Sequence, residues 1–110
     1  MTIDDLEAHG ANTAEGLARC MGSEELYLRL VGTALADDKF EALSDAIAAG
    51  DRDAAFEASH ALKGVLANLS LTPLCDPVTD ICELLRASKD ADYDALVAKV
   101  MATRQELLAL

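Results

Sequence analysis

The stretch DRDAAFEASHALKGVLANLS, residues 51–70, decides the fold of this chain, because its apolar side chains repeat with the period of an α-helix. On a helix that advances about 100° per residue, an apolar stripe forms on one side; it contains Ala55, Leu62, Val65, Leu66 and Leu69. His60 lies nearly opposite this stripe. Within roughly 60° of His60 lie Asp53, Glu57, Gly64, Ala67 and Leu71, with Asn68 about 80° away. The pattern predicts that this helix buries its stripe and turns His60 toward water.

Helical patterns continue on both sides of this stretch. Upstream, residues 23–49 are predicted to form one long helix, or two nearly collinear helices, that Ser23 can cap. Downstream, a fourth helix ends near residue 87 and begins at either Thr72-Pro73 or Asp76-Pro77, since each pair resembles a cap followed by proline. A last helix follows the polar turn at residues 88–92, and only short, weakly amphipathic segments precede residue 23.

The composition favours helices throughout. Alanine and leucine dominate, glycine occurs only 6 times, and no alternating β-branched runs indicate strands. Four amphipathic helices with short connections predict an all-α fold: an antiparallel four-helix bundle with an additional short N-terminal helix. We expect residues 1–110 to form a single domain, because a chain of this length can build one hydrophobic core but not two.

Charge and cysteine content limit the classes of partner. The net charge of −11 disfavours binding to nucleic acids and to anionic membrane surfaces, and no apolar run approaches the roughly 18 residues of a membrane span. The N-terminal residues have no secretory or transit character. Cys20, Cys75 and Cys82 form no C-x-x-C pair, so we interpret them as small hydrophobic side chains in a reducing compartment. We expect a cytoplasmic monomer without a metal site or cofactor.

The residues around His60 predict a reactive group that serves another protein. An exposed imidazole is partly neutral at neutral pH, so one ring nitrogen can attack an electrophile. Lys63 is placed to meet a newly attached anion, and Gly64 removes the side chain beside the ring. Glycine inside a helix costs about 1 kcal/mol relative to alanine, so Gly64 calls for a packing or functional reason. No phosphate-binding loop, magnesium cluster or Ser or Cys nucleophile accompanies His60. The chain is therefore expected to be a substrate and carrier and not an enzyme.

The segment His60-Ala61-Leu62-Lys63-Gly64, followed by Asn68-Leu69, resembles the H-x-L-K-G-x-x-x-N-[IL] segment of histidine-containing phosphotransfer (HPt) domains. Residues 15–17 and 23–27 resemble the opening helices of this family, and residues 48–51 with Ala54-Ala55 resemble its approach to the histidine helix. The resemblance implies a phosphorelay intermediate. In that role, His60 would accept a phosphoryl group from the aspartyl phosphate of one receiver domain and pass it to the aspartate of another.

The same resemblance implies partners and supporting residues. The partners would be receiver domains of response regulators, or of a hybrid histidine kinase, and they would carry the Mg²⁺. Lys63 would support the phosphoryl group and Gly64 would give the partner access. Because receivers of this family dock over the histidine helix, the candidate docking surface consists of Asp53, Glu57, Ala67, Asn68 and Leu71.

The sequence also departs from the family pattern. Ser70 stands where glycine is common, Pro77 interrupts a usually regular helix, and Cys82 replaces a residue that is often polar. One alternative is the phosphoacceptor domain of a sensor kinase, but Ala61 stands where those domains have an acidic residue. A second alternative, a helical module that binds or sequesters receivers without accepting phosphate, stays open.

Overall fold

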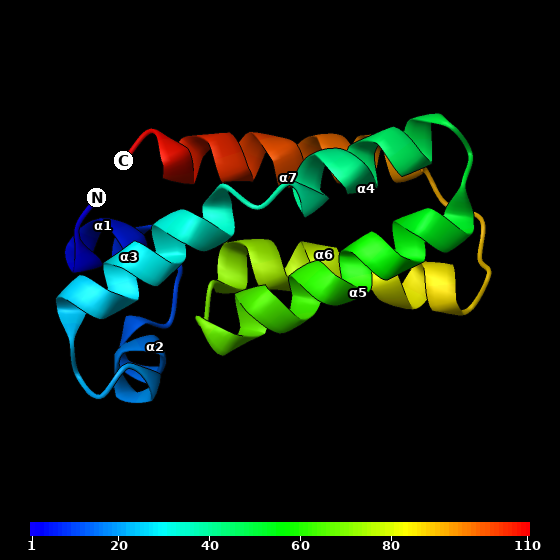
Figure 1. Cartoon of the computed structure of the whole chain (residues 1–110). Helices are drawn as coiled ribbons and strands as arrows, with labels where there is room; N and C mark the ends of the chain where they lie inside the picture. Colours follow the sequence, from blue (N-terminus) through cyan, green and yellow to red (C-terminus); the bar gives the residue numbers. More distant parts are fainter.

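The structure, a computed structural model that describes residues 1–110, consists of seven α-helices and contains no strand (Figure 1). The predicted all-α class is confirmed. The helices are α1 (Ile3–Ala8), α2 (Thr13–Arg19), α3 (Glu24–Leu35), α4 (Lys39–Ala48), α5 (Arg52–Asn68), α6 (Thr72–Arg86) and α7 (Tyr93–Leu108). No helix is both long enough and apolar enough to cross a membrane.

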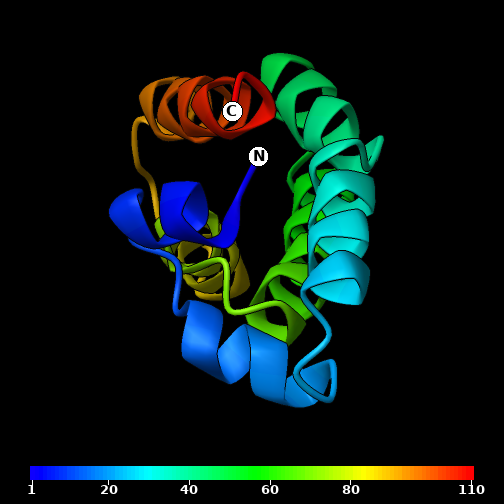
Figure 2. The ribbon, with the colours of Figure 1, turned by 90° about the vertical axis from the view of Figure 1, so that its left-hand side faces the viewer.

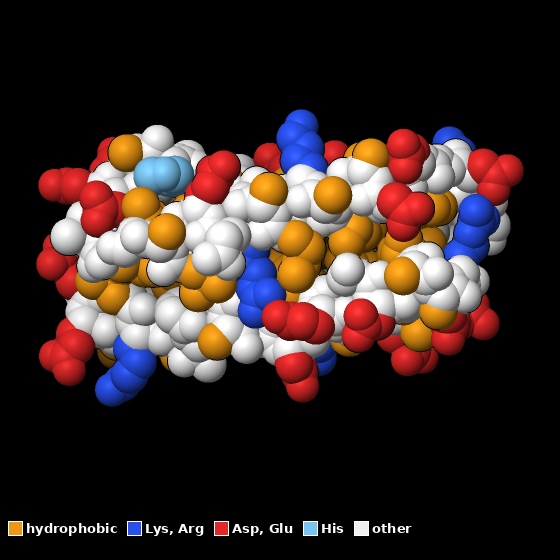
Figure 3. All heavy atoms as spheres, turned by 90° about the horizontal axis from the view of Figure 1, so that it is seen from above, with side chains coloured by type: hydrophobic (Ala, Val, Ile, Leu, Met, Phe, Trp, Pro, Cys, Tyr) orange, Lys and Arg blue, Asp and Glu red, His pale blue; other side chains and the backbone are white.

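Helices α4 to α7 pack around a shared interior. Helix α5 contacts α4 and α6, and α7 contacts the same two helices from the other side. From α4 to α7, successive helices reverse direction along the 40 Å long axis of the molecule (Figure 1). Helix α3 leads into α4 and also contacts α7, while α1 and α2 lie at the end where α3 begins (Figures 1 and 2). The surface over α4 and α7 carries more acidic than basic side chains (Figure 3).

A single apolar cluster of 24 buried residues extends from Leu6 to Leu107; it includes residues of every helix except α2, whose partly buried Leu17 packs against it. The predicted stripe supplies Ala55, Leu62, Leu66 and Leu69 to it. Complete burial of a leucine side chain contributes about 1.5–3 kcal/mol, so this stripe fixes which side of α5 faces inward. Val65 was predicted to belong to the stripe, but it lies at the edge and stays 36% exposed.

The predicted helix over residues 23–49 is divided into α3 and α4 by a short turn at residues 36–38. The Asp37 carboxylate accepts a hydrogen bond from the Lys39 backbone N–H at 2.9 Å. From α7, Arg104 Nε donates to the Leu35 carbonyl at 2.7 Å, where α3 ends. Of the two predicted possibilities for residues 23–49, one long helix or two helices, the structure has two. The N-terminal region also differs from the prediction, because it forms two short helices instead of one.

Helix α6 begins at the earlier of the two predicted positions. Thr72 is its first helical residue, and Leu71, not Thr72, is the N-cap residue, without a side-chain cap. Pro73 lies in the first turn, where backbone N–H groups have no intrahelical partner, so its missing N–H costs no hydrogen bond. Pro77 lies inside the helix, so α6 runs through the second candidate start.

Hydrogen bonds fix both ends of α5. At its start, the Asp51 carboxylate accepts from the Ala54 backbone N–H at 3.1 Å. At its end, Arg19 Nη1 donates to the Ala67 carbonyl at 2.9 Å, and the Tyr27 hydroxyl donates to the Leu69 carbonyl at 2.9 Å. Burial raises the pKa of Tyr27, which keeps this donor protonated. The helix that carries His60 is thus anchored by α2 and α3.

The chain turns directly after α5 at Ser70, whose φ of 54° lies in the left-handed region. Glycine adopts this conformation without strain, which accounts for its frequency at this position in the family that the sequence resembles. Here the Ser70 hydroxyl accepts from Arg19 Nη1 at 2.8 Å and donates to Glu15 Oε1 at 3.1 Å. These two hydrogen bonds offset part of the conformational cost of a left-handed backbone at serine.

Candidate functional site

His60 lies in the middle of α5 and is exposed, on the side away from the core. The predicted orientation of the ring is therefore observed. Its neighbours on this side are also exposed: Asp53, Glu57, Gly64, Ala67 and Asn68. Leu71 is the exception, and its inclusion in the docking surface was wrong. Because α5 ends at Asn68 and the chain turns at Ser70, Leu71 enters the core and is 0% exposed.

The aromatic ring of Phe56 packs against the imidazole of His60. The rings of Phe56 and His60 are stacked, with 5.7 Å between centroids and 11° between planes. The two residues are four positions apart on α5, which places them one above the other on the same side. The Arg86 guanidinium carbon, from α6, lies 5.2 Å from the centroid of the Phe56 ring. Sequence reasoning missed both residues, although the spacing of Phe56 and His60 was a readable signal.

Lys63 is held by a carboxylate from the neighbouring helix. Its Nζ atom lies 3.4 Å from Glu83 Oε1, and the other oxygen of Glu83 lies 3.4 Å from Arg86 Nε. These pairs are half-exposed, and such surface pairs contribute at most about 1 kcal/mol. An anion on His60 could therefore draw either cation away from Glu83 at small cost. Glu83 follows Cys82, which is fully buried in the core.

Gly64 occupies open space. A Cβ atom built there meets no other atom of the chain within 4 Å, so internal packing does not require glycine. A Cβ atom at Gly16, by contrast, would lie 2.4 Å from the Tyr27 Cε1 atom. The glycine beside His60 therefore has no packing reason within this chain.

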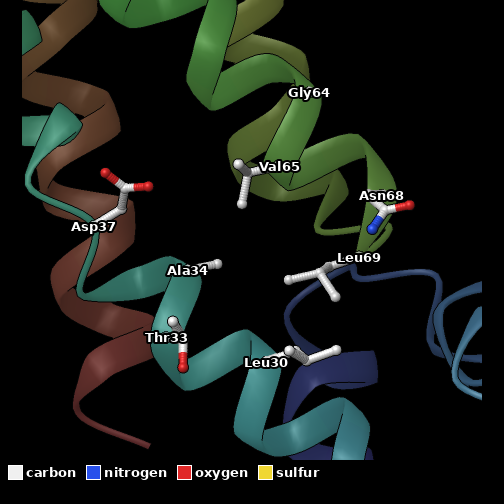
Figure 4. A pocket seen from close by; sticks show the side chains of 8 residues that line it. All are labelled: Leu30, Thr33, Ala34, Asp37, Gly64, Val65, Asn68 and Leu69. Carbon is white, nitrogen blue, oxygen red and sulfur yellow. The ribbon is translucent and has the colours of Figure 1, made fainter.

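A shallow apolar groove of about 540 Å³ adjoins Gly64 between α3 and α5 (Figure 4). Its lining residues are Leu30, Thr33, Ala34, Asp37, Gly64, Val65, Asn68 and Leu69. Leu30 and Val65 are 39% and 36% exposed, so two large apolar side chains from different helices face water here. Gly64 belongs both to this groove and to the side of α5 that carries His60. Exposed apolar side chains that gather in one groove are typical of a surface that binds another molecule.

The two flanks of the His60 side thus differ in chemistry. Toward α3 the surface is apolar, and toward α6 it carries the charged residues Lys63, Glu83 and Arg86. No group of three or more His, Cys, Asp or Glu side chains is arranged to hold a metal ion. All three cysteines are free thiols.

Comparison with known families agrees with this geometry. The sequence model of the Hpt domain matches residues 33–110, which is more than half of the chain, so the chain belongs to the Hpt domain family. The match contains His60, Lys63 and Gly64 and all of α4 to α7, while residues 1–32 lie outside it. Hpt domains function with receiver domains of response regulators in two-component phosphorelays. No curated protein and no solved structure matches the chain.

Proposed function

We propose that this chain is a phosphorelay intermediate in which His60 accepts a phosphoryl group from one receiver aspartate and delivers it to another. Helices α4 to α7 would then form the antiparallel four-helix bundle that carries the histidine. The observation that carries the proposal is the exposed imidazole at the centre of α5, beside a glycine that internal packing does not need. In this role the chain is a substrate and carrier and not an enzyme.

The transfer step needs one nucleophilic nitrogen from this chain. A ring nitrogen of neutral His60 attacks the phosphorus atom of the receiver's aspartyl phosphate. The N–P bond forms as the P–O bond to the aspartate breaks, and the electron pair of that bond leaves with the carboxylate. The proton on the other ring nitrogen stays in place, so the step balances without an added acid or base, and the reverse step regenerates His60. The receiver supplies Mg²⁺, and the release of Lys63 from Glu83 would place an ammonium near the phosphoryl oxygens.

The receiver would dock over the side of α5 that carries His60 and over the adjoining groove. The apolar groove between α3 and α5 gives the receiver an area to cover, and the missing side chain at Gly64 lets it approach the ring. Within this surface we assign docking roles to Asp53, Glu57, Ala67 and Asn68, which are exposed around His60. We propose that the protein acts as a monomer in the cytoplasm, since three free thiols suit a reducing compartment.

A second candidate is a module that binds receivers without accepting phosphate. The observation that favours it is the composition of the groove, whose lining residues do not include His60. Binding through the groove alone would sequester a receiver and leave the histidine unused. The sensor-kinase alternative has no such support, because the family that matches this chain is that of Hpt domains.

Phosphotransfer from a phosphorylated receiver to the wild type and to His60→Gln distinguishes the two candidates. We expect label on the wild type only, and that label should be stable to alkali and labile to acid, as in phosphohistidine. Circular dichroism and receiver binding of His60→Gln serve as controls, since the exposed side chain can be replaced without disturbing the core. If several receivers bind but label neither protein, or label both equally, the module that does not accept phosphate is the better description.

A further inference from the structure

We propose that Phe56 is a positioning residue for the phosphoryl transfer: it holds the plane of the His60 imidazole, and Arg86 holds Phe56. The kinetic part of this inference rests on the function proposed above, whereas the ordering of the ring does not.

The stack restricts a side chain that would otherwise rotate freely. An exposed histidine on a helix can adopt two staggered χ1 positions and a broad range of χ2 angles. A nearly parallel ring at 5.7 Å from centroid to centroid is the offset arrangement that aromatic pairs prefer, and it selects one plane. Phe56 is half-buried and so offers a firm support. It lies against one face of the imidazole, and the His60 residue as a whole stays exposed.

The ring of Phe56 is itself held by a residue of the neighbouring helix α6. Arg86, on α6, lies over the Phe56 ring at 5.2 Å, within the range of a cation–π interaction. Its Nε atom lies 3.4 Å from Glu83, the carboxylate that also contacts Lys63. The ion pair of Glu83 and Arg86 on α6 therefore fixes two features of the site: the plane of the His60 ring, through Phe56, and the position of the Lys63 ammonium. The orientation of the nucleophile depends on the packing of α5 against α6.

A fixed plane matters because the attacking lone pair lies in the plane of the ring. The nitrogen, the phosphorus and the leaving oxygen must approach a line, and small misplacements of reacting groups cost large factors in rate. The groove between α3 and α5 does not include Phe56. Phe56 does line a second surface groove together with Asp53 and Glu57, to which we assign docking roles. Because leucine keeps apolar bulk there, loss of the stack should slow the transfer step by a larger factor than it weakens receiver binding.

Four variants test this inference, each compared with the wild type. Phe56→Leu removes the stack but keeps apolar bulk, Phe56→Tyr restores an aromatic ring, and Arg86→Gln removes the cation. Arg52→Gln is the matched control, because Arg52 lies over the ring of Tyr93 at 5.3 Å and is as exposed as Arg86. Two quantities are measured: the mobility of the unphosphorylated His60 ring by NMR relaxation, and the rate of transfer from a phosphorylated receiver together with its Kd.

We expect a mobile ring and a transfer rate lowered by about tenfold or more in Phe56→Leu, with a smaller change in Kd. Phe56→Tyr should return both values to those of the wild type, Arg86→Gln should be intermediate, and Arg52→Gln should match the wild type. A wild-type ring as mobile as that of Phe56→Leu overturns the inference, as does a loss of receiver affinity in Phe56→Leu that is as large as its loss of transfer rate. If the ring is ordered by Phe56 but no receiver labels the wild type, positioning stands and the proposed function fails.

Discussion

Gly16 and Gly64 show that packing can require glycine at one position of a chain and not at another. Gly16 faces the ring of buried Tyr27, and an added methyl group would overlap the ring atoms. We expect Gly16→Ala to lower the free energy of unfolding by about 1–3 kcal/mol, since overpacking forces neighbouring atoms to move. Urea denaturation followed by circular dichroism measures the change. A variant as stable as the wild type would show that Tyr27 moves aside freely.

Gly64→Ala should have the opposite effect on stability. No atom opposes the new methyl group, and alanine is the better helix former, so the free energy of unfolding should rise by about 1 kcal/mol. At a closely packed interface the same methyl group costs about 1–3 kcal/mol, which corresponds to roughly 5- to 150-fold weaker receiver binding. Titration of the variant with an unphosphorylated receiver measures the affinity. Equal affinity in both proteins would assign Gly64 no part in docking.

At the scale of elements, Arg104 from α7 holds the turn between α3 and α4. It donates to the Leu35 carbonyl, pairs with Glu41 at 2.6 Å, and lies over the Phe40 ring at 4.6 Å. Its side chain is only 11% exposed. One cation thus joins the end of α3 to the start of α4, which explains why a turn without proline or glycine is stable there.

The hydrogen bond from Arg104 lowers the pKa of Glu41 below its ordinary value of 4.5. A carboxyl group whose folded pKa is lowered stabilises the fold above its unfolded pKa, and this contribution disappears as the pH falls through the folded pKa. Glu41→Gln should therefore be less stable than the wild type at pH 7, and the difference should shrink once the pH is below 4.5. Urea denaturation of both proteins from pH 7 to pH 3 measures the difference. A difference in the free energy of unfolding between the two proteins that stays constant from pH 7 to pH 3 would contradict the lowered pKa of Glu41.

The same elements show what the sequence can and cannot predict. Apolar periodicity was enough to predict that α5 exists and that His60 faces outward, because both depend on local spacing. The turn after α3 was not predictable, since it depends on Arg104, which is 69 residues away in the chain. Leu71 was misplaced because the periodicity was extended beyond the true end of α5. The contacts of Lys63 with Glu83 and of Phe56 with Arg86 required knowledge of how α5 packs against α6.

At the scale of the whole molecule, uncompensated negative charge is the main unfavourable electrostatic feature. The chain has 20 acidic and 9 basic residues. Six of the basic residues form ion pairs, yet these pairs engage only five carboxylates, because Glu83 is shared. The remaining acidic residues repel one another across a folded molecule whose extents are only 40 × 23 × 20 Å. Figure 3 shows acidic side chains at both ends of one face.

Salt should therefore stabilise this fold. The Debye length falls from about 30 Å at 0.01 M to about 8 Å at 0.15 M ionic strength, so repulsion that extends across the whole molecule at low salt becomes local. The expanded unfolded chain separates its charges more widely, and screening helps it less. We expect the free energy of unfolding to rise by on the order of 1 kcal/mol when NaCl is raised over this range. Urea denaturation at the two salt concentrations measures the change without adding ions of its own.

A charge-reduced variant provides the control for this effect. Asp45 and Glu106 are exposed, form no ion pair, and lie in the last turns of α4 and α7, where the helix dipole disfavours negative charge. Replacing them by Asn and Gln should stabilise the protein at low salt and reduce its response to NaCl. If salt stabilises the variant and the wild type equally, the effect belongs to general ion hydration and not to repulsion among carboxylates. If salt destabilises the wild type, the ion pairs at Lys63, Arg86 and Arg104 outweigh that repulsion.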